Sequence, residues 1–147
     1  MKKLITFALI AAVFAACSDD KNRAQELKDQ AFQSVIDSVA LAMTNKLPVM
    51  IDNFTRLDSV KSGARKSINY YYTLVSVDLD TINANDSISL DEIMVAMDEA
   101  LTDGVKNNAS LEVYRSNDAV INYHYFDRNS KFLFDVSITP DKYVEEE

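Results

Sequence analysis

The stretch that decides the fold is Ile68-Asn69-Tyr70-Tyr71-Tyr72-Thr73-Leu74-Val75-Ser76-Val77. Its β-branched and aromatic residues are typical of a strand, because such side chains pack well on a pleated surface. Successive side chains of a strand point to opposite faces. One face therefore carries Ile68, Tyr70, Tyr72 and Leu74, and the other carries Tyr71, Thr73, Val75 and Val77.

A second strand is expected before this one. Apolar residues occupy the odd positions Leu47, Val49, Ile51 and Leu57, and this period of two predicts a strand with a break or bulge near Val60. Ser62-Gly63 is the expected turn, because glycine adopts a positive φ at little cost. The two strands should form a hairpin.

The C-terminal part of the chain predicts another hairpin. Residues 119–126 read as a strand, residues 127–130 as a turn, and residues 131–139 as a strand that Pro140 ends. The last strand has the clearest alternation, which places four apolar residues on one face: Phe132, Phe134, Val136 and Ile138.

Two amphipathic helices complete the predicted domain. Residues 24–45 carry an apolar stripe at helical spacing, made of Leu27, Ala31, Val35, Val39 and Met43 and widened by Phe32, Ile36 and Ala40. A capping box, Ser89-Leu90-Asp91-Glu92, begins a second helix that Gly104 can close. Residues 108–116 suit a short helix or a strand, and we favour the helix.

These elements predict the α+β class. Their order is a long N-terminal helix, a β-hairpin, one or two helices and a second β-hairpin. Two hairpins separated by helices favour a four-stranded antiparallel sheet with the helices packed on one face. Residues 78–87 are rich in Asp, Asn, Ser and Thr and read as a loop.

Composition excludes several classes of activity. The chain has 147 residues and a formal net charge of −8, which argues against a nucleic-acid surface. Two glycines leave no room for a glycine-rich phosphate loop. A single cysteine excludes an internal disulfide and any multi-cysteine metal site. We expect no metal, no cofactor and no nucleic-acid partner.

The N-terminus has the pattern of an export signal. Lys2 and Lys3 precede an apolar run over residues 4–16 that is too short to span a membrane. The run ends in Phe14-Ala15-Ala16-Cys17, which resembles the lipobox of bacterial lipoproteins, with Phe14 where Leu is usual. The alternative is a plain secretory signal followed by an incidental cysteine.

The lipoprotein resemblance implies cleavage between Ala16 and Cys17 and acylation of the Cys17 thiol. Residues 1–16 would then be the signal peptide, 17–23 the lipidated cysteine and a short tether, 24–143 one globular domain and 144–147 an acidic tail. Loss of Lys2 and Lys3 brings the formal net charge to −10, so attachment to the membrane must come from acyl chains.

The residues after the cysteine bear on location. Ser18 resembles the residue at this position in lipoproteins sorted to the outer membrane, and Asp19-Asp20 resembles the export signal of surface-exposed lipoproteins in the Bacteroidetes. The alternative is a short polar tether. We therefore expect a lipid-anchored envelope protein, in the outer membrane, on its periplasmic side or at the cell surface.

Few residues point to chemistry. His124 is the sole histidine, so it cannot build a multi-histidine metal site, and no nucleophile motif supports its use as a general base. Asp78, Asp80 and Asp86 suggest calcium, but residues 78–88 contain neither the Gly nor the Glu that a calcium loop usually needs. A His124-dependent hydrolase is the weakest hypothesis.

Two further patterns give candidate sites. Tyr70, Tyr72, Tyr123 and Tyr125 alternate on two strands and form either an exposed binding face or a buried core face. Asp followed by Ser or Thr and an aliphatic residue recurs, and it resembles the O-glycosylation sequon of exported Bacteroidetes proteins. The acceptors would be Ser59, Thr81 and Ser87. Turn and cap chemistry is the alternative.

The leading functional hypothesis is a non-enzymatic module that binds a protein, peptide or glycan in the envelope. The second hypothesis is an accessory subunit of an envelope complex that docks through its first helix. An anchor motif, an acidic domain and the lack of a catalytic motif support both.

Overall fold

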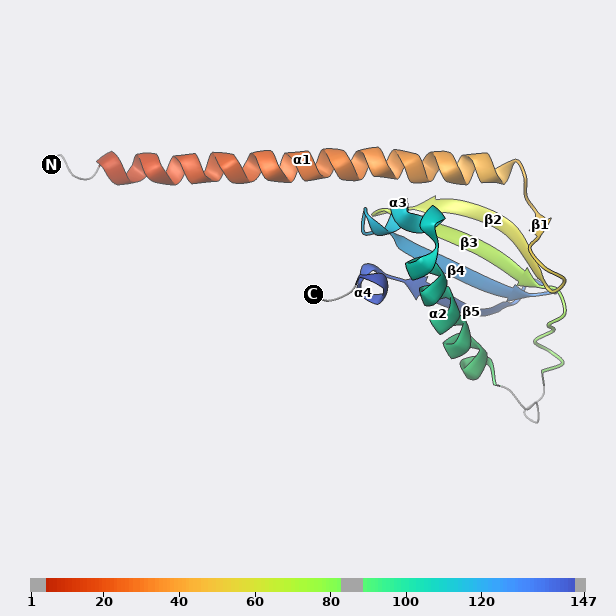
Figure 1. Cartoon of the computed structure of the whole chain (residues 1–147). Helices are drawn as coiled ribbons and strands as arrows, with labels where there is room; N and C mark the ends of the chain where they lie inside the picture. Colours follow the sequence, from red (N-terminus) through yellow and green to blue (C-terminus); the bar gives the residue numbers. More distant parts are fainter. Residues whose placement is uncertain (1–4, 83–88, 145–147) are drawn as a thin grey trace.

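A computed structural model describes residues 5–82 and 89–144, with side chains from residue 20 onward. Figure 1 shows a long helix, α1, lying along the β2 side of a curved sheet, with the helix α2 crossing the sheet below it. The helices are α1 (Ile5–Thr44), α2 (Leu90–Asn107), α3 (Glu112–Arg115) and α4 (Pro140–Tyr143), and the 3-10 turn η1 is Ala109–Leu111. The strands are β1 (Val49–Met50), β2 (Thr55–Gly63), β3 (Ser67–Leu74), β4 (Val120–Asp127) and β5 (Phe132–Ile138).

The α+β class is confirmed, but the predicted sheet is only roughly right. Within the described residues the sheet has five strands in the order β1-β2-β3-β4-β5. Strands β3 and β4 pair in parallel, whereas the other pairs are antiparallel. Two parallel neighbours need a crossover connection. Here the segment with α2, η1 and α3 returns the chain to the end of the sheet where β3 begins.

The first predicted strand is split in two. Residues 51–54 form a turn between β1 and β2, in which a carboxylate oxygen of Asp52 accepts hydrogen bonds from the backbone N–H groups of Phe54 (2.7 Å) and Thr55 (2.8 Å). An aspartate that binds the backbone ahead of it favours a turn over an extended strand. The β2–β3 register shifts between Leu57 and Ser59, close to the predicted bulge.

The β2–β3 turn differs from the prediction at Gly63. The residues with positive φ are Arg65 (57°) and Lys66 (59°), and Gly63 instead ends β2. Gln33 of α1 binds both ends of this turn, because its Nε2 donates to the Gly63 carbonyl (2.9 Å) and its Oε1 accepts from the Lys66 N–H (3.0 Å). The helix therefore fixes the turn that sequence reasoning assigned to glycine.

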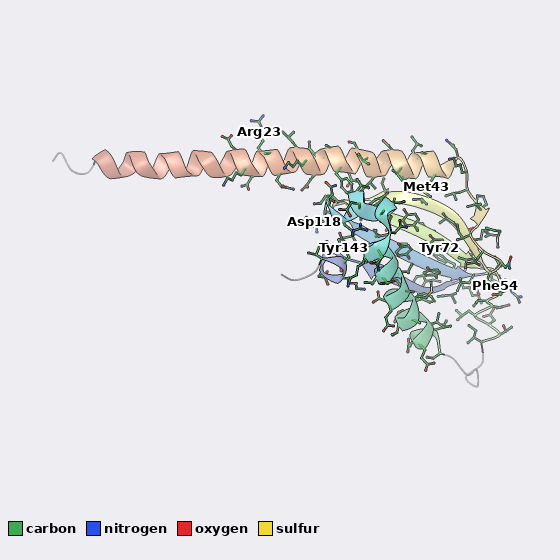
Figure 2. The ribbon with its side chains drawn as sticks, in the orientation of Figure 1. Arg23, Met43, Phe54, Tyr72, Asp118 and Tyr143 are labelled. Atoms are coloured by element: carbon green, nitrogen blue, oxygen red, sulfur yellow. The ribbon has the colours of Figure 1, made fainter. Side chains whose placement is uncertain are left out.

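The core face of α1 is rotated from the predicted stripe. Phe32, Ile36 and Ala40 are buried and Val39 and Met43 pack against the core. The first members of the predicted stripe, Leu27, Ala31 and Val35, are exposed. The sheet lies under only the C-terminal part of α1. Phe32, Ile36 and Ala40, which were expected at the margin of the apolar stripe, therefore lie at the centre of the buried face. Figure 2 shows Arg23 on the projecting part and Met43 on the side turned toward the sheet.

The second predicted helix and its start are confirmed. Ser89 and Glu92 form the capping box, with the Ser89 side chain accepting from the Glu92 N–H and the Glu92 side chain accepting from the Ser89 N–H. Gly104 does not close the helix, because α2 continues to Asn107 and the N–H of Asn108 donates to the Gly104 carbonyl. The favoured helix over residues 108–116 is also confirmed, as η1 followed by α3.

The helices pack on one face of the sheet, as predicted. Helix α1 packs on β2 and β3, and α2 packs on β5. The short helix α4 follows Pro140, and its Tyr143 is buried with its hydroxyl donating to the Ala119 carbonyl (2.7 Å). In the part of the chain that the structure describes, no helix is both long and apolar enough for a membrane span.

The α1 contact makes a stability prediction. Replacing Ile36 (0% exposed) with Ala should lower the free energy of unfolding by about 2–5 kcal/mol, because it leaves a cavity between α1 and the sheet. Replacing Leu41 (70% exposed) with Ala on the same helix should cost less than about 0.5 kcal/mol. Urea unfolding of both variants checks this, and equal losses would contradict the α1 packing.

Candidate functional site

The four candidate tyrosines meet as one aromatic cluster. The parallel register pairs Tyr70 with Tyr123 and Tyr72 with Tyr125. Their rings stack with centroids 5.6 Å and 5.4 Å apart, and Tyr125 extends the cluster to Phe134 of β5 at 4.9 Å. Strand pairing thus brings together residues that lie about 50 positions apart in the sequence.

This aromatic cluster lies on the face that the helices cover. Tyr123 and Tyr125 are buried, and Tyr70 and Tyr72 are half-buried and pack against the core. Burial raises the pKa of all four phenols, because it disfavours the charged phenolate. The structure therefore places these residues in the core, which was the alternative interpretation of their pattern.

A short repeat underlies the cluster and was missed in the sequence. Ile68-Asn69-Tyr70-Tyr71-Tyr72 and Ile121-Asn122-Tyr123-His124-Tyr125 share four of five residue types. The register aligns the two segments residue for residue. The shared Ile-Asn-Tyr-x-Tyr pattern was the signal that could have predicted the pairing of β3 with β4.

His124 lies on the opposite face of the sheet. Its ring stacks on Tyr71 with centroids 4.8 Å apart, and its Nε2 lies 3.3 Å from Oδ1 of Asn69. Asn122 donates to the same Asn69 oxygen at 3.0 Å. Asp135 is opposite His124 in the β4–β5 register, but no hydrogen bond joins them in the described structure. His124 thus belongs to a polar row with Asn69 and Asn122, and no Ser, Thr or Cys side chain among the described residues is hydrogen-bonded to its ring.

The predicted loop carboxylates are held by the β4–β5 hairpin. Asp78 forms an ion pair with Arg128, and Asp80 forms one with Lys131 at 2.5 Å. Within residues 20–82 and 89–144, no group of three or more His, Cys, Asp or Glu side chains is placed to hold a metal ion. Asp86 lies outside the described residues.

Asp127 is a structural carboxylate that sequence reasoning left as part of a turn. It is fully buried and accepts hydrogen bonds from the backbone N–H groups of Leu79 (3.0 Å), Asn129 (2.8 Å) and Lys131 (2.8 Å). Burial by itself would raise the pKa of this carboxyl, but the three donors outweigh it and the pKa is lowered. Asp127 thereby joins Leu79, in the segment after β3, to the β4–β5 hairpin.

The candidate modification sites lie in different environments. Ser59 is half-buried within β2, opposite Tyr71. Thr81 is exposed in the turn after β3, and its hydroxyl donates to the Asp78 carbonyl at 3.0 Å. Ser87 lies outside the described residues. Thr81 is the described acceptor with an accessible side chain.

Cys17 belongs to α1. The helix runs without a break from Ile5 to Thr44, so residues 17–23, expected as a short tether, continue the helix that packs on the sheet. Figure 1 shows the N-terminal part of α1 projecting beyond the sheet. Ala16 and Cys17 therefore lie on a helical extension and not within the globular part.

The fold has relatives among solved structures. A candidate secreted protein from Pseudomonas aeruginosa superposes with a TM-score of 0.60 at 11% identity over 80% of this chain and 97% of that protein. The type 2 secretion pilotin EpsS from Vibrio vulnificus gives 0.60 at 8% identity over 82% and 99%. The type II secretion pilotin AspS from Vibrio cholerae gives 0.57 at 10% identity over 81% and 98%.

At such low identity these similarities show the fold alone, a small α+β domain. No curated protein sequence matches the chain. The family described as "Domain of unknown function (DUF8479)" matches residues 26–134, and the chain belongs to this family.

Buried phenols predict a loss of stability at alkaline pH. Their pKa values are raised in the folded state, and burial raises that of Tyr143 to about 12. The contribution of these phenols to the free energy of unfolding is therefore fully present below their unfolded pKa of about 10. It is lost as the pH rises through their pKa values in the folded state.

Chemical unfolding across this range tests the expectation. The free energy of unfolding should be flat between about pH 8 and 9.5 and should decline above about pH 10. Tyr125→Phe keeps the stacked ring and removes one titrating hydroxyl, so its decline should be shallower. An identical slope in Tyr125→Phe would contradict burial of that phenol.

Proposed function

We propose that this protein is a lipid-anchored envelope protein that acts as a non-enzymatic interaction module, and more specifically as an accessory subunit of an envelope assembly. The observation that carries the proposal is the position of Cys17 on α1, the helix that also packs on the sheet. An acyl group on Cys17 would be joined to the domain by continuous helix.

The helical connection sets the distance between membrane and domain. Cys17 precedes Phe32 by 15 residues, and Phe32 is the first buried residue of α1 from residue 20 onward. At 1.5 Å per residue, this corresponds to about 22 Å of α-helix. The formal charge of −10 after cleavage keeps the domain away from anionic lipid, which suits a spacer that holds the domain off the surface. The domain would therefore present its surfaces to partners in the envelope.

The fold supports the accessory-subunit form of the proposal. Two of the solved structures that share it are pilotins of type II secretion systems. The polar surroundings of His124, with no activated nucleophile in the described structure, favour binding over catalysis. We place the protein at the outer membrane, on its periplasmic side or at the cell surface, because Ser18 follows Cys17.

Anchoring makes a direct prediction. Replacing Cys17 with Ser should move the protein from the membrane to the soluble fraction, because acylation needs the thiol and one unmodified helix end gives no anchor. Ser18→Ala, the matched neighbour, should stay in the membrane. The intact mass of the native protein should equal that of a chain that begins at Cys17, with the mass of the acyl chains added. A soluble native protein, or an unmodified mass, would contradict the proposal.

We also propose that Thr81 is the O-glycosylation acceptor of the described residues. Its support is the Asp80-Thr81-Ile82 pattern and the exposed position of Thr81 in a turn. The half-buried Ser59 is the less accessible candidate, and Ser87 stays a prediction from sequence. The same intact-mass spectrum would show hexose-sized increments, and their absence would contradict this modification.

Exposed aliphatic residues on α1 support docking through this helix. Leu27 (60% exposed) and Val35 (45% exposed) lie outside the buried Phe32, Ile36 and Ala40 stripe of the helix. Exposed aliphatic residues on one helix face are typical of helix-mediated association. This surface is available because the sheet engages only the Phe32, Ile36 and Ala40 side.

The helix surface can be tested without unfolding the domain. Leu27→Ser with Val35→Ser should shift the native protein from a large membrane assembly to the size of a monomer in native gels. The matched control, Val113→Ser, has the same 45% exposure as Val35 but lies on α3 and should leave the assembly intact. A monomer-sized wild-type protein, or equal effects of the two variants, would contradict docking through α1.

A further inference from the structure

A groove runs between α2 and the outer edge of β5. Met94, Val95, Asp98 and Glu99 of α2 line one side, and Asp135 and Ser137 of β5 line the other. The groove measures about 360 Å³. None of these residues belongs to the tyrosine cluster or to α1, whereas Ser137 donates to Asn122 (2.8 Å) and so joins the groove to the polar row that contains His124.

Strand β5 presents an open backbone edge to this groove. It is the last strand of the sheet, and it pairs with β4 on one side only. Among the described residues, no backbone hydrogen bond reaches its other side. The free side of this seven-residue strand is a template to which another extended segment can add. By contrast, β1 at the opposite edge has only two residues.

The groove carries uncompensated negative charge. The one cation on its lining, Lys142, is bound to Asp98 at 2.5 Å. Glu99 and Asp135 are exposed and have no ion-pair partner in the described structure. Two neighbouring hollows along α2 add Asp91, Glu92 and Asp103 against Lys106. A ligand of this groove should therefore be basic.

An apolar strip lies beside the carboxylates. Val95 is 56% exposed and Met94 is half-buried, and Val136 of β5 lies below them in the core. Lys and Arg side chains have apolar stems that can cover such a strip while their charged ends reach a carboxylate. Val95 and Glu99 are one helical turn apart, which is the spacing that such a side chain requires.

We propose that the groove binds an extended basic segment of another protein, which adds to β5 as a further strand of the sheet. Its side chains on the helix side lie over Val95 and reach Glu99, and those on the other side reach Asp135. A second copy of this chain is a poor occupant, because its own groove is also acidic and like charges across an interface repel. This inference rests on the proposed function in one respect, since it names the ligand chemistry of the interaction module.

A synthetic peptide of strand length serves as the probe. The peptide has about eight residues that alternate valine and lysine, and its matched counterpart alternates valine and glutamate. Both are titrated against the mature protein purified from the envelope in detergent, and amide hydrogen exchange is followed in β5. The basic peptide should bind and should slow exchange in residues 132–138, and the acidic peptide should not bind.

Charge variants distinguish binding of the basic peptide at the groove from its nonspecific attraction to an acidic protein. Glu99→Gln with Asp135→Asn should weaken binding about fivefold, because it removes two exposed ion pairs. Glu26→Gln with Asp37→Asn makes the same change of net charge on α1 and should leave the affinity unchanged. Equal weakening by the two double variants would overturn the proposal.

The remaining outcomes are also decisive. Binding of the basic peptide without protection of β5, equal binding of the acidic peptide, or no binding of either would overturn the proposal. Protection of β5 in a concentration-dependent dimer without peptide would assign the edge to a second copy instead. Peptide binding is measured on purified protein, so its failure leaves anchoring through Cys17 untouched, and a failure of anchoring leaves the peptide result untouched.

Discussion

The parallel pairing of β3 with β4 is the interaction on which the rest of the structure depends. It aligns Ile68 with Ile121 and stacks Tyr70 and Tyr72 on Tyr123 and Tyr125. The result is a wide apolar and aromatic face in the middle of the sheet, which must be removed from water. Because parallel neighbours need a crossover, the same pairing also dictates that the α2 segment passes over that face.

Helices α1 and α2 cover different strands of this face. The C-terminal part of α1 covers β2 and β3, and Gln33 fixes it to the β2–β3 turn. Helix α2 covers β5, and Lys142 of α4 binds Asp98 on its outer side. Since α1 is longer than the sheet it covers, its N-terminal part is left free to project toward the position of Cys17. Cys17 and the α1 residues that reach the core are thus parts of one continuous helix.

The uncovered surfaces follow from the same arrangement. The opposite face of the sheet holds a polar and aromatic row that includes Asn69, Asn122 and His124, whose side chains satisfy one another. The edge at β5 stays open because β5 is the last strand and pairs only with β4, and no other backbone bond reaches it among the described residues. A domain built this way offers three distinct surfaces, namely the outer side of α1, the open sheet face and the β5 groove. Each of these surfaces is exposed, so each could contact another molecule without a change in the fold.

Much of the secondary structure was predictable because it depends on local patterns. Alternation in residues 131–139 predicted β5, and the Ser89–Glu92 capping box predicted the start of α2. The turn at residues 51–54 was missed because a period of two in the apolar residues concealed the backbone hydrogen bonds of Asp52. The role given to Gly63 was wrong because contacts from a distant residue, Gln33, fix that turn.

The sequence by itself determined the α+β class, the main helices and strands, and the motif around Cys17, since each of these depends on residue types at short spacing. Only the tertiary structure decided that β3 and β4 run parallel, which side of α1 meets the core, and that the four tyrosines lie beneath helices. Those choices depend on which segments meet across more than 40 residues of chain, and periodicity within one segment carries no information about its partner.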